Sequence, residues 1–251
     1  MSAVGARTFH TSPAFLVRSA DMGEADRRLS FFTRDAGVVA TVGKSAWRSR
    51  KRFGGTLQRY VLLDVSWTES PGKLAVLSAA SISESFWPVV EDWDKVRHAD
   101  YLLEIAAELF PQAGPKPKAF GILLDGFRAL AAGESPGQTA RRVEAGFLAV
   151  GGWGPDLSGC RRCGKMDCRW YRFVPSEGGV LCESCPPAGG GRLSLGSLKT
   201  WRALQTGKSA ARGRLRIPDP IILELQVVIP GYVEYCLGKA TRSLGGEALR
   251  I

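Results

Sequence analysis

The sequence predicts an α+β protein, because three different patterns follow one another along its 251 residues. Residues 12–83 alternate short apolar runs with turn-forming stretches, which is typical of β-strands. Residues 94–150 carry apolar side chains at helical spacing. Residues 160–185 contain most of the cysteines. We therefore expect a disordered tail at 1–11, a β domain at 12–86, and an α-helical domain at 87–251 with a cysteine-rich insert at 160–185.

The β domain should contain five strands. The apolar or alternating runs that predict them cover residues 14–18, 27–33, 37–43, 57–67 and 74–83. Gly, Asp and Ser-rich stretches separate these runs and predict turns. Five strands in about seventy residues fit a small closed barrel, and the five-stranded OB-fold, which commonly binds single-stranded nucleic acids, is the natural candidate.

The second half should be mainly helical. Apolar residues recur every three or four positions in residues 94–110, 118–132 and 138–150, and two more helices are expected at 194–206 and 219–242. We expect Pro230 and Gly231 to kink or break the last helix. Between the cysteine pairs, residues 170–174 and 179–181 predict a short hairpin, and 186–191 a flexible exit from the insert.

The insert carries the strongest motif of the chain. Two Cys-x-x-Cys pairs are separated by eighteen residues, and they comprise Cys160, Cys163, Cys182 and Cys185. This spacing is typical of a structural zinc site with four thiolate ligands and no open coordination position. A redox dithiol and a metal-free remnant are the alternatives. Cys168 could replace Cys163 as a ligand, whereas Cys236, on an apolar helical face, is expected to be a packed free thiol.

The charge distribution indicates a polyanionic partner. The formal net charge is +10, and two basic ends flank an acidic middle. The cations of one predicted loop, which also contains Trp47 and ends at Phe53, are Lys44, Arg48, Arg50, Lys51 and Arg52. Cations that could extend this surface are Arg27, Arg28, Arg34 and Arg59. Such a loop suits a single strand, with cations on phosphates and rings on bases. The alternative is a solvated hairpin whose aromatic side chains belong to the core.

Catalytic motifs are weak, so we expect a protein that is not an enzyme. The two histidines, His10 and His98, form no Ser/His/Asp set. The Gly-Lys-Ser triplets at 43–45 and 207–209 lack the upstream glycine of a phosphate-binding loop. A zinc-ribbon adaptor and a metal-dependent nuclease remain as rival interpretations. No window of eighteen uncharged apolar residues predicts a membrane span, and no signal peptide is evident, so a cytoplasmic protein is expected.

Several short segments of the chain form a recognisable series. They are FLVR at 15–18, GEADR at 23–27, FTRDAG at 32–37, GK at 43–44, RSRKRFGGTLQ at 48–58, RRVE at 141–144, Leu148, GGW at 151–153, PDL at 155–157 and Cys160. Together they resemble the RecO family of bacterial DNA repair proteins. The resemblance runs from about residue 12 to 245 in the right order. Its motifs are individually modest and jointly specific. The extra N-terminal residues and Cys168 depart from the family pattern.

The resemblance implies an N-terminal OB-fold, a helical body and often a four-cysteine zinc insert. It implies binding of single- and double-stranded DNA, annealing of complementary strands, and assistance to RecA loading on strands coated by single-strand-binding protein. RecR and the acidic C-terminal tail of the single-strand-binding protein are the implied partners, and a nucleoid-associated location follows. By position, the loop from Lys44 to Arg52 should meet DNA. Arg141 and Arg142 should grip the acidic tail, unless they are ordinary solvated helix charges.

Overall fold

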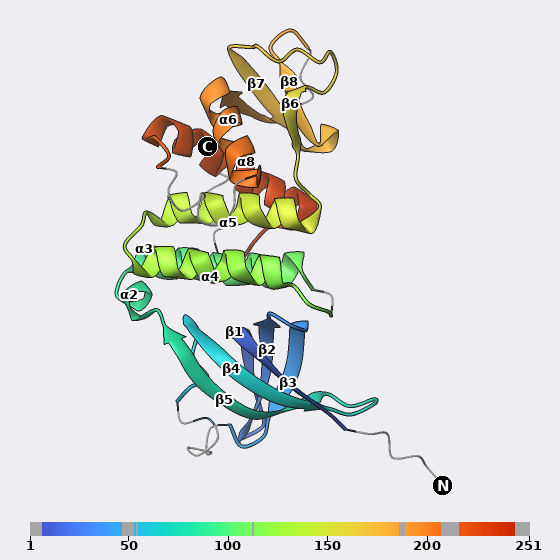
Figure 1. The fold of residues 1–251 in the computed structure, drawn as a ribbon, viewed down its shortest axis with the longest axis vertical. Helices are drawn as coiled ribbons and strands as arrows, with labels where there is room; N and C mark the ends of the chain where they lie inside the picture. The colour runs from blue at the N-terminus through green and yellow to red at the C-terminus, as the bar shows by residue number, and fades with distance from the viewer. Residues whose placement is uncertain are drawn as a thin grey trace.

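The computed structural model describes residues 7–46, 53, 55–111, 113–185, 189–206 and 216–243. Its elements form successive layers along the longest axis of the molecule (Figure 1). The N-terminal barrel lies at one end, helices fill the middle, and a small second sheet lies at the other end. The α+β class with an OB-like barrel and a helical second half is confirmed.

The five N-terminal strands close into a barrel. They are β1 (Thr8–Met22), β2 (Asp26–Thr33), β3 (Gly37–Gly43), β4 (Val61–Glu69) and β5 (Ala75–Ser85), in the order β1-β2-β3-β5-β4. Strand β1 pairs with both β2 and β4, which closes the ring. Strands β3 and β5 meet in a short parallel pairing, while the other pairs are antiparallel.

The structure corrects the expected start of the barrel. Residues 8–11, which we expected in a disordered tail, belong to β1 and pair with β4, with Thr8 opposite Glu69 and Thr11 opposite Ser66. This segment is only four residues long, which is too short for its sequence to show a clear strand pattern. Its backbone hydrogen bonds are supplied by a strand more than fifty residues away, which local patterns do not reveal.

The helices of the middle layers lie close to the expected ranges. They are α2 (Trp87–Val90), α3 (Trp93–Leu109), α4 (Pro117–Ala131), α5 (Pro136–Gly151), α6 (Leu195–Thr206) and α8 (Asp219–Leu237). The carboxylate of Asp92 caps α3 by accepting hydrogen bonds from the backbone N–H groups of Asp94 and Lys95. Helix α2 was not expected, because a single turn leaves no periodicity to detect.

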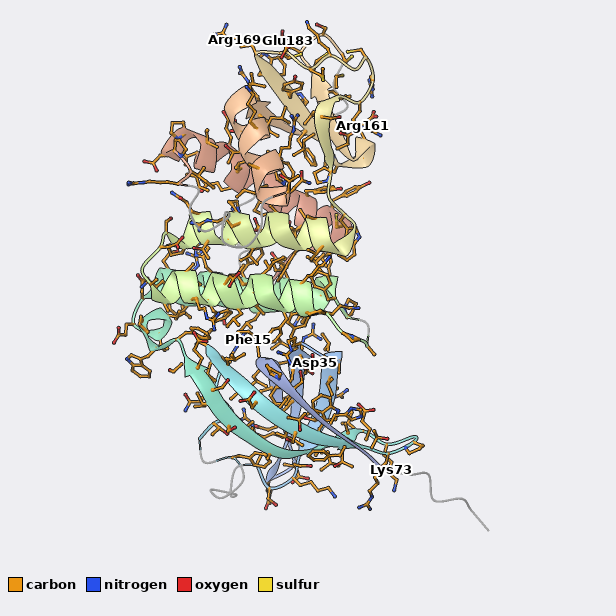
Figure 2. All side chains as sticks on the ribbon, in the orientation of Figure 1. Phe15, Asp35, Lys73, Arg161, Arg169 and Glu183 are labelled. Carbon is orange, nitrogen blue, oxygen red and sulfur yellow. The ribbon has the colours of Figure 1, made fainter. Side chains whose placement is uncertain are left out.

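One apolar core joins the outer face of the barrel to the helices, and a second core fills the barrel. Along β1, Ala14 and Leu16 face the barrel interior, whereas Phe15 and Val17 face the helices. The Phe15 ring packs on Phe127 of α4, with the ring centroids 4.9 Å apart. Figure 2 shows Phe15 where the barrel meets the helical layers. The side-chain alternation of one strand thus serves two cores.

Helix α8 passes through Pro230 without a break. A proline leaves the carbonyl four residues earlier without its helical donor, which here is the carbonyl of Gln226. Nη1 of Arg141, on α5, lies 3.5 Å from this oxygen and donates to it. The expected break of the helix at Pro230 was therefore wrong, whereas a kink there stays a prediction.

Helix α8 is also long and apolar enough, by length and composition, to cross a membrane. One of its faces, however, is part of the protein core, with Leu225, Ile229 and Val233 fully buried. Core helices of globular proteins share this composition, so α8 is weak evidence for a membrane span.

The cysteine insert is built on a four-stranded sheet. Strands β6 (Asp156–Cys160), β7 (Trp170–Val174), β8 (Gly179–Cys182) and β9 (Gly191–Ser194) lie in the order β6-β8-β7-β9. The β7–β8 hairpin matches the predicted one, and the short 3-10 helix Pro175–Glu177 connects its strands. Strands β6 and β9 are too short to show a pattern and were not expected.

Candidate metal centre and nucleic-acid interface

The four predicted cysteines converge on one point. The Sγ atoms of Cys160, Cys163, Cys182 and Cys185 all lie within 4.8 Å of one another. The Cys160 and Cys185 sulfurs are 3.7 Å apart, and those of Cys163 and Cys182 are 3.5 Å apart. A tetrahedral ion with bonds of about 2.3 Å to sulfur requires sulfur–sulfur distances of about 3.8 Å. These distances therefore fit a tetrahedral thiolate site, and they are far too long for disulfides.

Two turns at the ends of strands position these sulfurs. Cys160 ends β6 and Cys182 ends β8, so two ligands are fixed by the sheet. Gly164, with φ +74°, lets the chain reverse after the first pair, and its N–H donates to the carbonyl of Cys160. The ends of two strands and this turn thus bring the sulfurs together.

The pKa values of the four thiols also favour a bound cation. Burial raises the pKa of the Cys160 thiol, but hydrogen bonds from backbone N–H groups outweigh burial and lower this pKa to about 6. The hydrogen bond with the Cys182 sulfur, followed by burial, raises the pKa of Cys185 to about 12. Four thiolates this close repel one another, so a divalent cation is needed to hold all four deprotonated.

The other two cysteines stand apart from this cluster. Cys168 is buried, and its backbone N–H donates to the hydroxyl oxygen of Tyr171. It is not one of the converging sulfurs, so the alternative in which it replaces Cys163 has no support. Cys236 is partly buried against the core on α8, which fits a packed thiol.

A concave groove runs along the outside of the barrel. Its volume is about 540 Å³, and its lining comprises Leu16–Ala20, Arg28, Ser30 and Arg59. Three guanidinium groups, those of Arg18, Arg28 and Arg59, therefore face one hollow. Arg59 is also held by Asp100 of α3, with 3.0 Å between Nη1 and Oδ1. The groove thus gathers three arginines, as the charged grooves of single-strand sites do, and no aromatic ring is among its described lining residues.

Sequence reasoning missed Arg18, because a single arginine at the end of an apolar run carries no signal. The pairing of β1 with β2 shifts register between Leu16 and Arg18, and a bulge of this kind redirects the following side chain. Arg18 also forms an ion pair with Glu108 of α3, which helps hold the helical layer against the groove.

The remaining predicted DNA-binding residues are only partly brought together. Lys44 is exposed directly after β3, at the same end of the barrel as Arg27, which faces Gly43 across β2 and β3. Arg27 is largely buried and contacts Asp21 and Ser19. Arg34 follows β2 at the opposite end and bonds to Asp35, so it lies away from Lys44. Arg48, Arg50, Lys51 and Arg52, with Trp47, lie outside the described residues.

Phe53 is a different case. Its ring is 2% exposed and belongs to the core inside the barrel. The expectation that it stacks on bases was therefore wrong, and the alternative that this aromatic residue belongs to the core holds. Its burial fixes the end of the cationic loop on the barrel.

Comparison with known proteins gives a consistent result over both halves of the chain. The family model "Recombination protein O N terminal" matches residues 8–86, and "Recombination protein O C terminal" matches residues 90–245. The "DNA repair protein RecO" of Anaeromyxobacter sp. (strain K) is 32% identical over 228 residues, which are 89% of this chain and 90% of that protein. The chain belongs to the RecO family. The RecO protein of a Nocardioides species is 29% identical over 241 residues, or 92% of this chain and 96% of the relative.

Membership of the RecO family confirms the role in DNA repair and recombination. Because RecO proteins are recombination mediators and not enzymes, membership also agrees with the absence of a catalytic motif in the sequence. The sequence resemblance predicted that Arg141 and Arg142 contact the acidic tail of the single-strand-binding protein.

These two arginines of the RecO chain lie inside the helical layer. The Arg141 side chain is 4% exposed and binds both carboxylate oxygens of Glu144, at 2.5 and 2.6 Å. The Tyr101 hydroxyl of α3 donates to the same carboxylate at 2.5 Å. The Arg142 side chain is 10% exposed and pairs with Glu134. Neither arginine is an ordinary solvated helix charge. Their contact with an acidic tail stays a prediction.

Proposed function

We propose that this RecO protein is a recombination mediator that binds single- and double-stranded DNA and anneals complementary strands. In this proposal it assists the loading of RecA, together with RecR, onto single strands coated by single-strand-binding protein. It acts in the cytoplasm, associated with the nucleoid. The observation that carries the proposal is the arginine-lined groove on the closed barrel.

The mechanism rests on charge and not on bond chemistry. Cations that neutralise phosphates release counterions, which drives binding of any sequence. Two complementary strands repel each other through their phosphates, and a basic surface that binds both lowers this repulsion. In the groove, planar guanidinium groups, and not the buried side chains of Leu16 and Val17, offer unpaired bases a surface to stack on.

The four-cysteine cluster is proposed to hold Zn²⁺ with a structural role. Four sulfurs fill a tetrahedron and leave no position for a substrate or an activated water. The bound ion would tie the turn after β6 to the turn after β8. It would thereby stabilise a sheet of four- and five-residue strands that has little core of its own.

The predicted contact with the acidic tail is best placed at Arg142. Glu134, the partner of Arg142, has a side chain that is 34% exposed, so an incoming carboxylate can compete for the guanidinium. Arg141 is committed to Glu144 in the interior. Replacement of Arg142 by Gln should weaken binding of a tail peptide in fluorescence anisotropy, whereas replacement of Arg128, which pairs with Glu84, should not.

The decisive experiment measures annealing of labelled complementary strands, with and without single-strand-binding protein. We expect annealing to fall steeply as salt rises, because each phosphate contact to a single strand adds about 0.7 to the logarithmic salt slope. Arg28→Glu should reduce single-strand affinity. Lys73→Glu, an equal charge change at an exposed turn outside the groove, is the matched control.

Figure 2 shows Lys73 at the far side of the barrel from the helices. A flat salt response, or equal effects of the two charge reversals, would count against the groove as the DNA-binding site. Charge reversal at Arg48, Arg50 and Arg52 tests the loop in the same assay. If DNA binding survived that change as well, the adaptor interpretation would replace the mediator.

A further inference from the structure

A second cationic and aromatic surface lies on the zinc-insert sheet, at the opposite end of the molecule from the barrel (Figure 1). In β7, Tyr171 and Phe173 are buried, so Trp170 and Arg172 lie on the other, outward face. Arg192 of β9 is directly opposite Arg172 in the strand register and shares that face. We call Trp170, Arg172 and Arg192 the Trp170 platform.

The platform is a stack of cations on an indole. The guanidinium carbon of Arg192 lies 5.0 Å from the centroid of the Trp170 ring, and that of Arg172 lies 6.0 Å from it. Nη1 of Arg172 donates to the carbonyl of Gly190 at 3.1 Å, which fixes this side chain along β9. The planar groups are therefore held in place on two paired strands and do not depend on a mobile loop.

The arginines of the platform form no ion pair with a described residue. Arg172 and Arg192 are like charges on facing strand positions, an arrangement that opposes folding. Glu224 attracts Arg192 from beyond ion-pair distance and accepts the backbone N–H of Ser194. Elsewhere in the same insert, by contrast, Arg161 pairs with Asp156 and Arg162 pairs with Glu177.

A further cation extends the platform along the chain. Arg169 directly precedes Trp170, is exposed, and forms no ion pair with a described residue. In Figure 2 it lies at the outermost end of the molecule. The insert thus presents two arginines over one half-buried indole and a third next to it in the sequence, whereas its ion-paired arginines, Arg161 and Arg162, lie in the turn after β6.

We propose that the Trp170 platform is a second binding site for single-stranded DNA, distinct from the barrel groove. This inference rests on the proposed function. Guanidinium planes and an indole offer stacking surfaces to unpaired bases, while the net positive charge attracts the backbone phosphates. Duplex DNA hides its base faces and would use only the charges. An acidic peptide would use the charges and leave the ring without a role.

Two sites at opposite ends of one molecule allow it to hold two strands at once. A strand bound at the barrel and a strand bound at the platform become tethered to each other, which raises their effective concentration. The platform therefore contributes to bridging and annealing, while the barrel groove alone suffices to bind one strand.

The first test locates the strand. The full-length protein is irradiated with a single strand that carries 5-bromodeoxyuridine, and the crosslinked peptides are identified by mass spectrometry. We expect crosslinks at the barrel and at the peptide that contains Trp170. The same experiment with a duplex should lose the Trp170 crosslink. Crosslinks confined to the barrel would overturn the inference and leave the proposed function intact.

The second test measures bridging, by capture of a labelled strand on beads that carry an unlabelled strand. The double variant R172Q/R192Q should lose bridging on the order of tenfold while it still binds one strand. Arg192→Lys keeps the charge but loses the planar group, so it should retain the salt slope and bridge less well. The control K95Q/K199Q removes the same charge from helices α3 and α6.

The outcomes separate the two proposals. Equal bridging by R172Q/R192Q and K95Q/K199Q would refute the platform. Absence of any strand binding by the unmodified protein would refute the proposed function instead. Metal content and thermal melting of each variant show whether it is folded, and Trp170→Phe, which keeps an aromatic ring, tests stacking if Trp170→Ala does not fold.

Discussion

The buried pair of Arg141 and Glu144 gives the most quantitative prediction. The Glu144 carboxylate is fully buried, receives two N–H groups from Arg141 and one hydroxyl from Tyr101. Burial raises the pKa of Glu144, and the Arg141 charge opposes this effect. Replacement of Arg141 by Met would leave the carboxylate buried with only the tyrosine as a partner.

The expected magnitude follows from what is left unpaired. Loss of one partner of a buried ion pair costs about 3–5 kcal/mol of unfolding free energy, because the other charge stays desolvated. Replacement of both residues, as in R141M/E144M, removes both charges and should cost far less than either single change. Tyr101→Phe removes one hydrogen bond to a charged group and should cost about 1.5–3 kcal/mol.

Urea denaturation of the wild type, both single variants and the double variant forms a cycle that isolates the pair energy. We expect R141M and E144M to be strongly destabilised and R141M/E144M to be close to wild type. If the two single losses simply added in the double variant, the pair would not be coupled, and the reasoning from burial would be refuted. The same double variant tests the tail contact, because it lacks Arg141 yet should remain folded.

Three further predictions follow from the same structure. Cys163→Ser should release about one zinc ion per chain in metal analysis, whereas Cys168→Ser should keep it. The reason is that Cys163, unlike Cys168, supplies one of the four converging sulfurs. Phe15→Ala should cost about 3–5 kcal/mol in denaturation, because this ring joins barrel and helices. The hydrogen bond from Arg128 lowers the pKa of Glu84, so the stability that the ionised Glu84 contributes is present above pH 4.5 and lost as pH falls through the folded-state pKa. Glu84→Gln should therefore reduce the acid dependence of stability, by under about 1 kcal/mol, in melting curves.

Local patterns predicted the elements that local forces decide. The strand β3 was predicted to the residue, because its apolar run is bounded by Gly37 and Gly43. The cysteine cluster was also predicted, because the spacing within and between the two Cys-x-x-Cys pairs identifies it. In both cases the residues that make the structure are close to one another in the sequence.

Long-range contacts decided the remainder. Arg141 and Arg142 were expected to grip an acidic tail or else to be solvated helix charges. Arg141 is instead buried, because Glu144 of the same helix and Tyr101 of α3 complement it. Phe53 was interpreted as part of a nucleic-acid loop, yet it belongs to the core inside the barrel. Local patterns do not reveal such burial, because it depends on elements that only the fold brings near.

The position of the cysteines relative to the Trp170 platform would give a bound zinc ion a specific role. Cys182 faces Tyr171 in the register of β7 and β8, so this cysteine neighbours the strand that carries Trp170 and Arg172. Release of the proposed ion would free the turns after β6 and β8, and the short strands between them would lose a tie. The barrel has its own closed sheet and core, which such an ion would not touch.

Removal of zinc by a chelator should therefore separate the two activities. We expect single-strand binding by the barrel to persist, with bridging and annealing reduced to the level of R172Q/R192Q. Gel-shift and bead-capture measurements on the same chelated sample report both quantities, and added zinc should restore bridging. Equal loss of both activities would mean that the ion stabilises the whole molecule. Unchanged bridging would mean that the insert sheet holds its shape without metal, or that the second strand binds elsewhere.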